Sequence, residues 1–131
     1  MAQQQTILIV DDDAELRGAL AEQLQIHEEF HTAEAGAGAD GVEAAREIKP
    51  DLILLDVDLP DMDGREACRL MRKNGVTAPV IRLTAVASDS DTILGLESGA
   101  NDYVTNPFRF GVLLARIRAQ LRSHEQSEGA V

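Results

Sequence analysis

The chain of 131 residues is long enough for one domain with a hydrophobic core, and aliphatic side chains must fill that core because only 3% of the residues are aromatic. The formal net charge of -11 disfavours binding to nucleic acid or to an anionic membrane surface, and favours a divalent cation or a basic protein partner. The sequence contains no apolar run of the roughly 18 residues that a membrane span needs, no secretory signal at its N-terminus and only one cysteine, Cys68, so we expect a cytoplasmic domain without a disulfide.

Short apolar segments predict five β-strands along the chain. In order they are TILIV (6–10), a weaker FHTAEA (30–35), DLILLDV (51–57), PVIRLT (79–84) and DYVT (102–105). Runs such as LILL lack polar alternation, which is typical of strands that are buried on both faces of a parallel sheet.

Apolar residues recur at helical spacing between these strands and after the last one. The stripes are Leu16, Leu20 and Leu24; Val42, Ala45 and Ile48; Ala67, Leu70 and Met71; Ile93 and Leu96; and Leu114, Ile117 and Leu121. Five strands alternating with five helices predict an α/β fold, a doubly wound (βα)5 three-layer sandwich around a parallel sheet. We expect this domain to span residues 1–122, with 123–131 a polar tail or the start of an interdomain linker.

Carboxylates follow two of the predicted strands, at the edge where ligands of an open parallel sheet bind. Asp11 and Asp12 come after the first strand, and Asp56 ends the third. If these strands are neighbours, the three side chains converge and raise one another's pKa. Mg2+ would relieve this repulsion, because it prefers oxygen ligands and needs few of them from the protein.

Other polar residues near the strand ends have structural interpretations. Asp13 stands where the first helix begins and is expected to be its N-cap. Asp61 and Asp63 are expected to be turn and cap residues around Gly64. Thr84 is the last residue of the fourth predicted strand. Taken alone, it fits an ordinary strand end as well as it fits a functional hydroxyl.

Four stretches together resemble the receiver domain of bacterial two-component response regulators. They are ILIVDDDAELR (7–17), PDLILLDVDLPDMDG (50–64), PVIRLTA (79–85) and GANDYVTNPF (99–108), and the resemblance covers roughly residues 6–122. The motifs are an acidic pair, a D-x-x-x-P-x-x-x-G stretch, Thr-Ala, and Pro-Phe after the last strand. This resemblance implies a five-stranded parallel sheet in the order 2-1-3-4-5 with five helices.

The resemblance assigns the acidic residues to phosphoryl transfer. Asp56 would be the phosphoacceptor, and a phosphohistidine on a sensor histidine kinase would be the donor. Asp12 and Asp56 would bind Mg2+ directly, Asp11 through water, and Asp58 through its backbone carbonyl. The chain would not be an enzyme, beyond self-catalysed phosphotransfer and autodephosphorylation.

The resemblance also implies a switch and an output face. The hydroxyl of Thr84 would hydrogen-bond to a phosphoryl oxygen, and Tyr103 would be an aromatic switch that turns inward as Thr84 moves. The output would lie on the face formed by the fourth helix, fifth strand and fifth helix. OmpR-type winged-helix regulators dimerise through this face, and Asp102, Arg116 and Arg118 match parts of their ion-pair set, whereas Asn101 stands where an acid is usual.

The segment LLARIRAQLRSH (113–124) is similar to the last receiver helix of that OmpR-type class. In such proteins a linker and a DNA-binding domain follow, so this class would contact DNA only through an output domain that the sequence lacks. We therefore favour a receiver cut from a transcription regulator at its domain boundary over a stand-alone receiver.

Two residues depart from the family pattern near the site. Asn106 stands where the family has a lysine, and an amide offers only a neutral hydrogen bond to a phosphoryl oxygen, so we expect phosphotransfer to survive and switching to weaken. Arg82 replaces an apolar residue inside the fourth strand, on the same side as Thr84. We expect its guanidinium either to replace the missing cation or to find a carbonyl, an acid or solvent while its stem packs in the core.

Other classes of protein fit the sequence less well. Asp11 and Asp13 have the D-x-D spacing of aspartate-nucleophile phosphatases, but the chain is short for a cap domain and Glu15 replaces the expected Thr or Val. A flavodoxin-like site would need a phosphate-binding loop where DDD stands, and an EF-hand in DVDLPDMDG would place Pro60 at a ligand position. A degenerate receiver that acts as a phosphorylation-independent interaction module stays the alternative.

Overall fold

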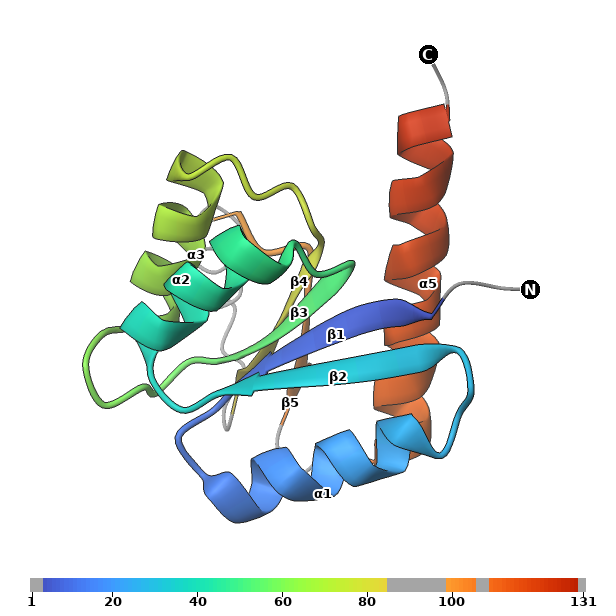
Figure 1. Cartoon of the computed structure of the whole chain (residues 1–131), viewed down its shortest axis with the longest axis horizontal. Helices are drawn as coiled ribbons and strands as arrows, with labels where there is room; N and C mark the ends of the chain where they lie inside the picture. The colour runs from blue at the N-terminus through green and yellow to red at the C-terminus, as the bar shows by residue number, and fades with distance from the viewer. Residues whose placement is uncertain (1–3, 85–98, 106–108, 130–131) are drawn as a thin grey trace.

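Five parallel strands form one sheet at the centre of the computed structural model, which describes residues 4–84, 99–105 and 109–129 (Figure 1). The strands are β1 (Gln5–Val10), β2 (Phe30–Ala35), β3 (Leu52–Asp56), β4 (Val80–Thr84) and β5 (Asp102–Thr105). They are hydrogen-bonded in the order β2-β1-β3-β4-β5, which confirms the predicted sheet. Each predicted strand agrees with the structure to within one residue at its ends.

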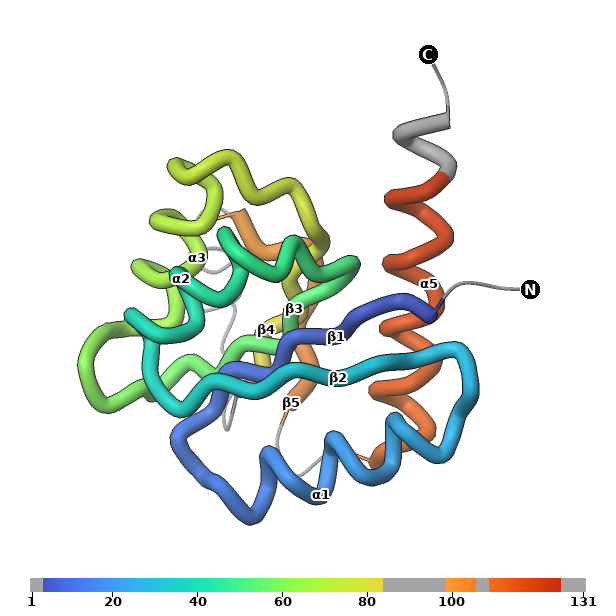
Figure 2. Tube along the Cα trace, in the orientation of Figure 1, coloured from blue at the N-terminus to red at the C-terminus, as the bar shows by residue number. Residues whose placement is uncertain are grey.

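Helices cover both faces of the sheet. In the described ranges they are α1 (Ala14–Gln25), α2 (Gly38–Ile48), α3 (Gly64–Lys73) and α5 (Phe110–Gly129), with α1 and α5 on one face and α2 and α3 on the other (Figures 1 and 2). The predicted helix that carries Ile93 and Leu96 lies outside the described residues. Helix α5 continues past residue 122, so the predicted tail begins as helix. None of the helices described is long and apolar enough to cross a membrane.

Side chains of the strands alternate between two hydrophobic clusters. Ile7 and Ile9 of β1 pack with residues of α1 and α5, whereas Leu8 and Val10 pack with residues of α2 and α3. All four side chains are fully buried, which explains why the predicted strands lack polar alternation. Most residues of the predicted helical stripes join these clusters, whereas Ile48 at the end of α2 is 46% exposed.

Arg72 of α3 fastens the end of the sheet opposite to the predicted site. Its guanidinium donates to the backbone carbonyls of Gly99, Val76 and Ala78 and to the side-chain oxygen of Asn101 at 3.0 Å. The same Asn101 oxygen accepts the backbone N–H of Val80 at 2.9 Å. Asn101 therefore has a structural role between α3, β4 and β5, in which its amide oxygen serves as a neutral acceptor.

A tight connection brings the chain back from β3 into α3. The N–H of Gly64 donates to the carbonyl of Val57 at 2.8 Å, and Asp58 and Asp63 form an antiparallel bridge. A Cβ atom at position 64 would lie 2.4 Å from the carbonyl oxygen of Asp56 and 2.9 Å from the Cα atom of Val57. Glycine is required here because the backbone of α3 touches the backbone of β3 directly.

We expect Gly64→Ala to lower the free energy of unfolding by about 2–3 kcal/mol, because two backbone segments must separate to admit the new methyl group. Gly18→Ala in α1 is the matched control, since a Cβ there meets nothing within 4 Å. That change should raise the free energy of unfolding by roughly 0.5–1 kcal/mol through helix propensity. Urea unfolding of both variants checks this, and equal effects would contradict the assignment of Gly64.

Candidate metal centre

Three carboxylates converge at one edge of the sheet. Strands β1 and β3 are neighbours, with Val10 paired to Leu55, so the residues that follow β1 lie beside the end of β3. One oxygen atom from each of Asp11, Asp12 and Asp56 lies within 4.8 Å of the others. The structure thus brings together the residues that the sequence nominated as metal ligands.

The three carboxylates differ in exposure and in hydrogen bonding. Asp11 is only 3% exposed, Asp56 is half-buried and Asp12 is exposed. The side chain of Asp11 accepts the N–H of Asp13 at 2.9 Å, and that of Asp56 accepts the N–H of Asp58 at 3.4 Å. These backbone donors orient two of the carboxylates without neutralising them.

Burial and mutual repulsion make the ionised cluster costly. Burial, followed by the charge of Asp11, raises the pKa of Asp56 to about 6, although the backbone N–H groups of Asp58 and Val57 oppose this shift. Burial is also the main cause of the raised pKa of Asp11. A bound divalent cation would remove both costs, so the donor set fits a hard metal ion with oxygen ligands.

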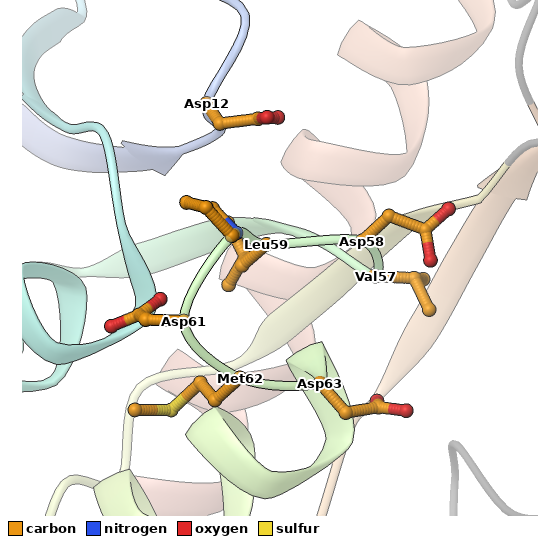
Figure 3. Close-up of a pocket in the computed structure, with 8 residues that line it drawn as sticks. Asp12, Val57, Asp58, Leu59, Asp61, Met62 and Asp63 are labelled. Carbon is orange, nitrogen blue, oxygen red and sulfur yellow. The ribbon is translucent and has the colours of Figure 1, made fainter.

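A pocket of about 390 Å³ opens beside the cluster (Figure 3). Asp12 forms one wall, and the connection between β3 and α3, residues 57–63, forms the other. We call this connection the β3–α3 loop. The exposed residue Asp58, whose carbonyl was predicted to bind the metal, lies in this loop and lines the pocket.

Asp63 and Asp13 cap helices as predicted, but Asp61 has an unexpected partner. The carboxylate of Asp13 accepts the N–H groups of Glu15 and Leu16 in α1, and that of Asp63 accepts the N–H of Arg65 in α3. Asp61 instead reaches across to α2, where its two oxygens accept backbone N–H groups. Local sequence carries no signal for this contact, because it joins residues far apart in the chain.

The predicted phosphoryl-binding residues are only partly covered by the structure. Thr84 is the last residue of β4 and pairs with Thr105 of β5, so its backbone lies at the same edge as the carboxylate cluster. The Thr84 side chain and all of Asn106 lie outside the described residues, and their roles stay predictions. Tyr103 is half-buried on β5.

Arg82 is a buried cation inside the sheet. It is 4% exposed and stands in register between Leu55 of β3 and Tyr103 of β5, so the three side chains share one face. Its charge contributes to the lowered pKa of Asp63, after the larger effect of Arg65. The charges that raise the pKa of Asp56 come from Asp11 and Asp12. A role for Arg82 as the replacement cation stays a prediction.

The residues proposed for a dimer face separate into two groups. Asp102 and Arg116 form an ion pair within the chain at 3.0 Å, between β5 and α5. Arg118 on the same helix binds Glu29, in the connection between α1 and β2. The structure therefore joins only Asp102 and Arg116 on one surface, and dimerisation through this face stays a prediction.

Known proteins resemble this chain in sequence and in fold. Residues 7–118 match the family described as response regulator receiver domain. The DNA-binding response regulator MtrA of Mycobacterium tuberculosis (strain ATCC 25618 / H37Rv) is 47% identical over 124 residues, which cover 92% of this chain and 52% of MtrA. The transcriptional regulatory protein AfsQ1 of Streptomyces coelicolor is 47% identical over 122 residues, with coverages of 92% and 53%. The chain thus spans about half the length of the curated relatives it matches.

A solved structure extends this similarity to the fold. The BeF3-activated N-terminal receiver domain of Klebsiella pneumoniae RstA superposes with a TM-score of 0.83 at 38% identity. The match covers 89% of this chain and 98% of that domain. The sheet order and the flanking helices are therefore those of receiver domains with solved structures.

We expect Asp56→Asn to raise the free energy of unfolding of the metal-free protein by about 1–2 kcal/mol at pH 7, because the ionised carboxylate is disfavoured in the folded state. The raised pKa means that the natural chain regains this stability as the pH falls. The advantage of the variant is therefore full above about pH 6 and vanishes below about pH 4. Urea unfolding in EDTA across this pH range checks the prediction. A difference in the free energy of unfolding between variant and natural chain that does not change with pH would contradict it.

Proposed function

Because this chain belongs to the response regulator receiver family, we propose that it accepts a phosphoryl group on Asp56 from a sensor histidine kinase and thereby controls an output. The observation that carries the proposal is the convergence of Asp11, Asp12 and Asp56 at the carboxyl ends of adjacent strands. This intact cluster gives no support to a degenerate receiver that would work without phosphorylation.

The carboxylate of Asp56 is the nucleophile of the proposed reaction. One of its oxygens attacks phosphorus, the bond from phosphorus to the histidine nitrogen breaks, and the electron pair returns to the imidazole ring. Even in the metal-free domain, a pKa of about 6 leaves most of Asp56 ionised at neutral pH, as a nucleophile must be. Half-burial at the end of β3 holds the side chain still, and the adjacent pocket gives the donor access.

The residues present suit Mg2+ as the cofactor. Asp12 and Asp56 would hold it directly with their carboxylates, Asp11 through a water molecule, and Asp58 through its backbone carbonyl. When bound, the ion supplies positive charge that stabilises the phosphoryl oxygens during transfer. The negative charges of Asp11 and Asp12 would thus attract the cation to this edge of the sheet. The bound cation would then reduce the electrostatic repulsion between the cluster and an anionic phosphoryl donor that approaches Asp56.

The relatives suggest what the phosphorylated domain controls. MtrA and AfsQ1 are described as a DNA-binding and a transcriptional regulator, and the chain matches about half of each. We propose that the receiver regulates transcription in the cytoplasm, as part of an OmpR-type protein whose DNA-binding output domain contacts the genome. Its own chemistry is limited to self-catalysed phosphotransfer and autodephosphorylation.

Acetyl phosphate with Mg2+ tests the phosphoacceptor directly. We expect the chain to gain the mass of one phosphoryl group and to lose it slowly, with the modification on Asp56. Asp56→Asn and addition of EDTA should each abolish the gain, whereas Asp40→Asn, a control on the exposed surface of α2, should leave it unchanged. Intact mass spectrometry reads the result, and modification elsewhere in the chain would refute the assignment.

Asn106 should uncouple phosphorylation from the output face, because its amide replaces a charge-assisted hydrogen bond with a neutral one. We expect Asn106→Lys to gain phosphoryl mass as the natural chain does, but to respond to beryllofluoride with a larger shift at Tyr103 and stronger dimerisation. Beryllofluoride is a suitable probe because the solved receiver domain of RstA is in its BeF3-activated form. NMR spectra and sedimentation measure the two effects. An equal response of both proteins would show that Asn106 does not impair switching.

A further inference from the structure

We propose that Asp61 positions the β3–α3 loop for metal binding, by capping helix α2 from across the sheet edge. The inference rests on the proposed function, because it concerns how this chain shapes the same metal site. Asp61 is not one of the three clustered carboxylates and both of its oxygens bind α2, so it would act through the loop and not as a catalytic residue.

The contact between Asp61 and α2 uses both carboxylate oxygens. Oδ1 accepts the N–H of Gly38 at 2.7 Å, and Oδ2 accepts the N–H of Ala39 at 2.9 Å. The N-cap residue of α2 is Ala37, which has no side-chain acceptor of its own. A helix N-terminus is usually capped by the side chain of its own N-cap residue. In α2 the carboxylate of Asp61 takes this role from a loop that is distant in the sequence, and its negative charge suits the positive end of the helix dipole.

Close packing accompanies this contact. A Cβ atom at Gly38 would lie 2.4 Å from Cγ of Met62 and 3.1 Å from Oδ1 of Asp61, so the first turn of α2 rests directly on the loop. Figure 3 shows the carboxylate of Asp61, one of the residues that line the pocket, beside the start of α2, while Asp12 lies on the opposite wall. The side chain of Met62 and the carboxylate of Asp61 thus link the loop to the first turn of α2.

Helix α2 also contacts the strand that carries the other two acids. A Cβ atom at Gly41 would lie 2.7 Å from Cγ1 of Val10, the last residue of β1. Asp11 and Asp12 follow directly. One helix turn therefore touches both walls of the metal site: the end of β1 through Gly41, and the β3–α3 loop through Gly38. This makes α2 a spacer between the carboxylate pair and the loop that follows Asp56.

The loop is closed at its base and tied at its tip. At the base, the N–H of Gly64 donates to Val57, and Asp58 bridges to Asp63. At the tip, Asp61 makes the two bonds to α2. Asp58 belongs to the base, three residues before Asp61, and lines the pocket, so loss of the bonds at the tip would leave the base contacts alone to hold its carbonyl relative to Asp12.

Variants of Asp61 distinguish the effect of its hydrogen bonds to α2 from the effect of its negative charge. We expect Asp61→Ala to raise the Kd for Mg2+ about tenfold, a typical cost for a residue that supports metal ligands. Asp61→Asn keeps one acceptor oxygen and should raise the Kd about threefold, although it removes the same charge. Asp40→Asn, which removes an exposed carboxylate from the first turn of α2, should leave the Kd within about twofold. Titration with MgCl2, followed by the NMR signals of Gly38 and Ala39, measures all of them.

A second variant separates positioning from simple stabilisation of α2. Ala37→Ser introduces a local N-cap, and in the Asp61→Ala background it should restore most of the lost thermal stability without restoring the affinity for Mg2+. If the serine restores both, Asp61 only stabilises the helix, and the inference is wrong. It is also wrong if Asp61→Ala binds Mg2+ like the natural chain, or if Asp40→Asn weakens binding equally.

The natural chain itself distinguishes failure of this inference from failure of the proposed function. If it neither binds Mg2+ nor accepts a phosphoryl group from acetyl phosphate, the proposed function fails. If it does both and every Asp61 variant matches it, the receiver function stands and only the positioning role is lost.

Discussion

Repulsion among three carboxylates is the constraint around which this structure is organised. Asp11, Asp12 and Asp56 are held with one oxygen atom of each within 4.8 Å of the others because two largely buried parallel strands end side by side. The hydrophobic faces of β1 and β3 supply the free energy that offsets this electrostatic cost. A cluster of like charges is well suited to bind a cation. Burial, followed by repulsion from Asp11, raises the pKa of Asp56 because both disfavour the ionised carboxylate.

The surroundings of the cluster preserve its negative charge. Arg17 donates to the backbone carbonyl of Asp11 and to the side chain of Glu34, not to a carboxylate of the cluster. Arg116 and Arg118 pair with acids elsewhere on the domain. Among the described residues, these three arginines therefore form their hydrogen bonds with the structural framework and leave the carboxylates of the cluster to other partners.

The β3–α3 loop shows how the framework controls the site at a distance. Gly64 lets the chain return against β3, and Asp61 fastens the loop to α2. Because α2 also packs on the end of β1, an adjustment of that helix would alter both walls of the pocket together. The proposed metal affinity would therefore depend on packing between α2 and the loop as well as on the ligands themselves.

Local patterns were sufficient for the strands, the helix caps at Asp13 and Asp63, and the choice of the three acids. Apolar runs, helical periodicity and strand-end carboxylates all act within a few residues of chain, and so they can be recognised in the sequence. The partners of Asp61 and the register of Arg82 between Leu55 and Tyr103 required the folded chain. Asp61 looked like a turn residue because the donors that it binds, Gly38 and Ala39, precede it by more than 20 positions. Contacts of that kind are selected by packing between elements, which no local pattern encodes.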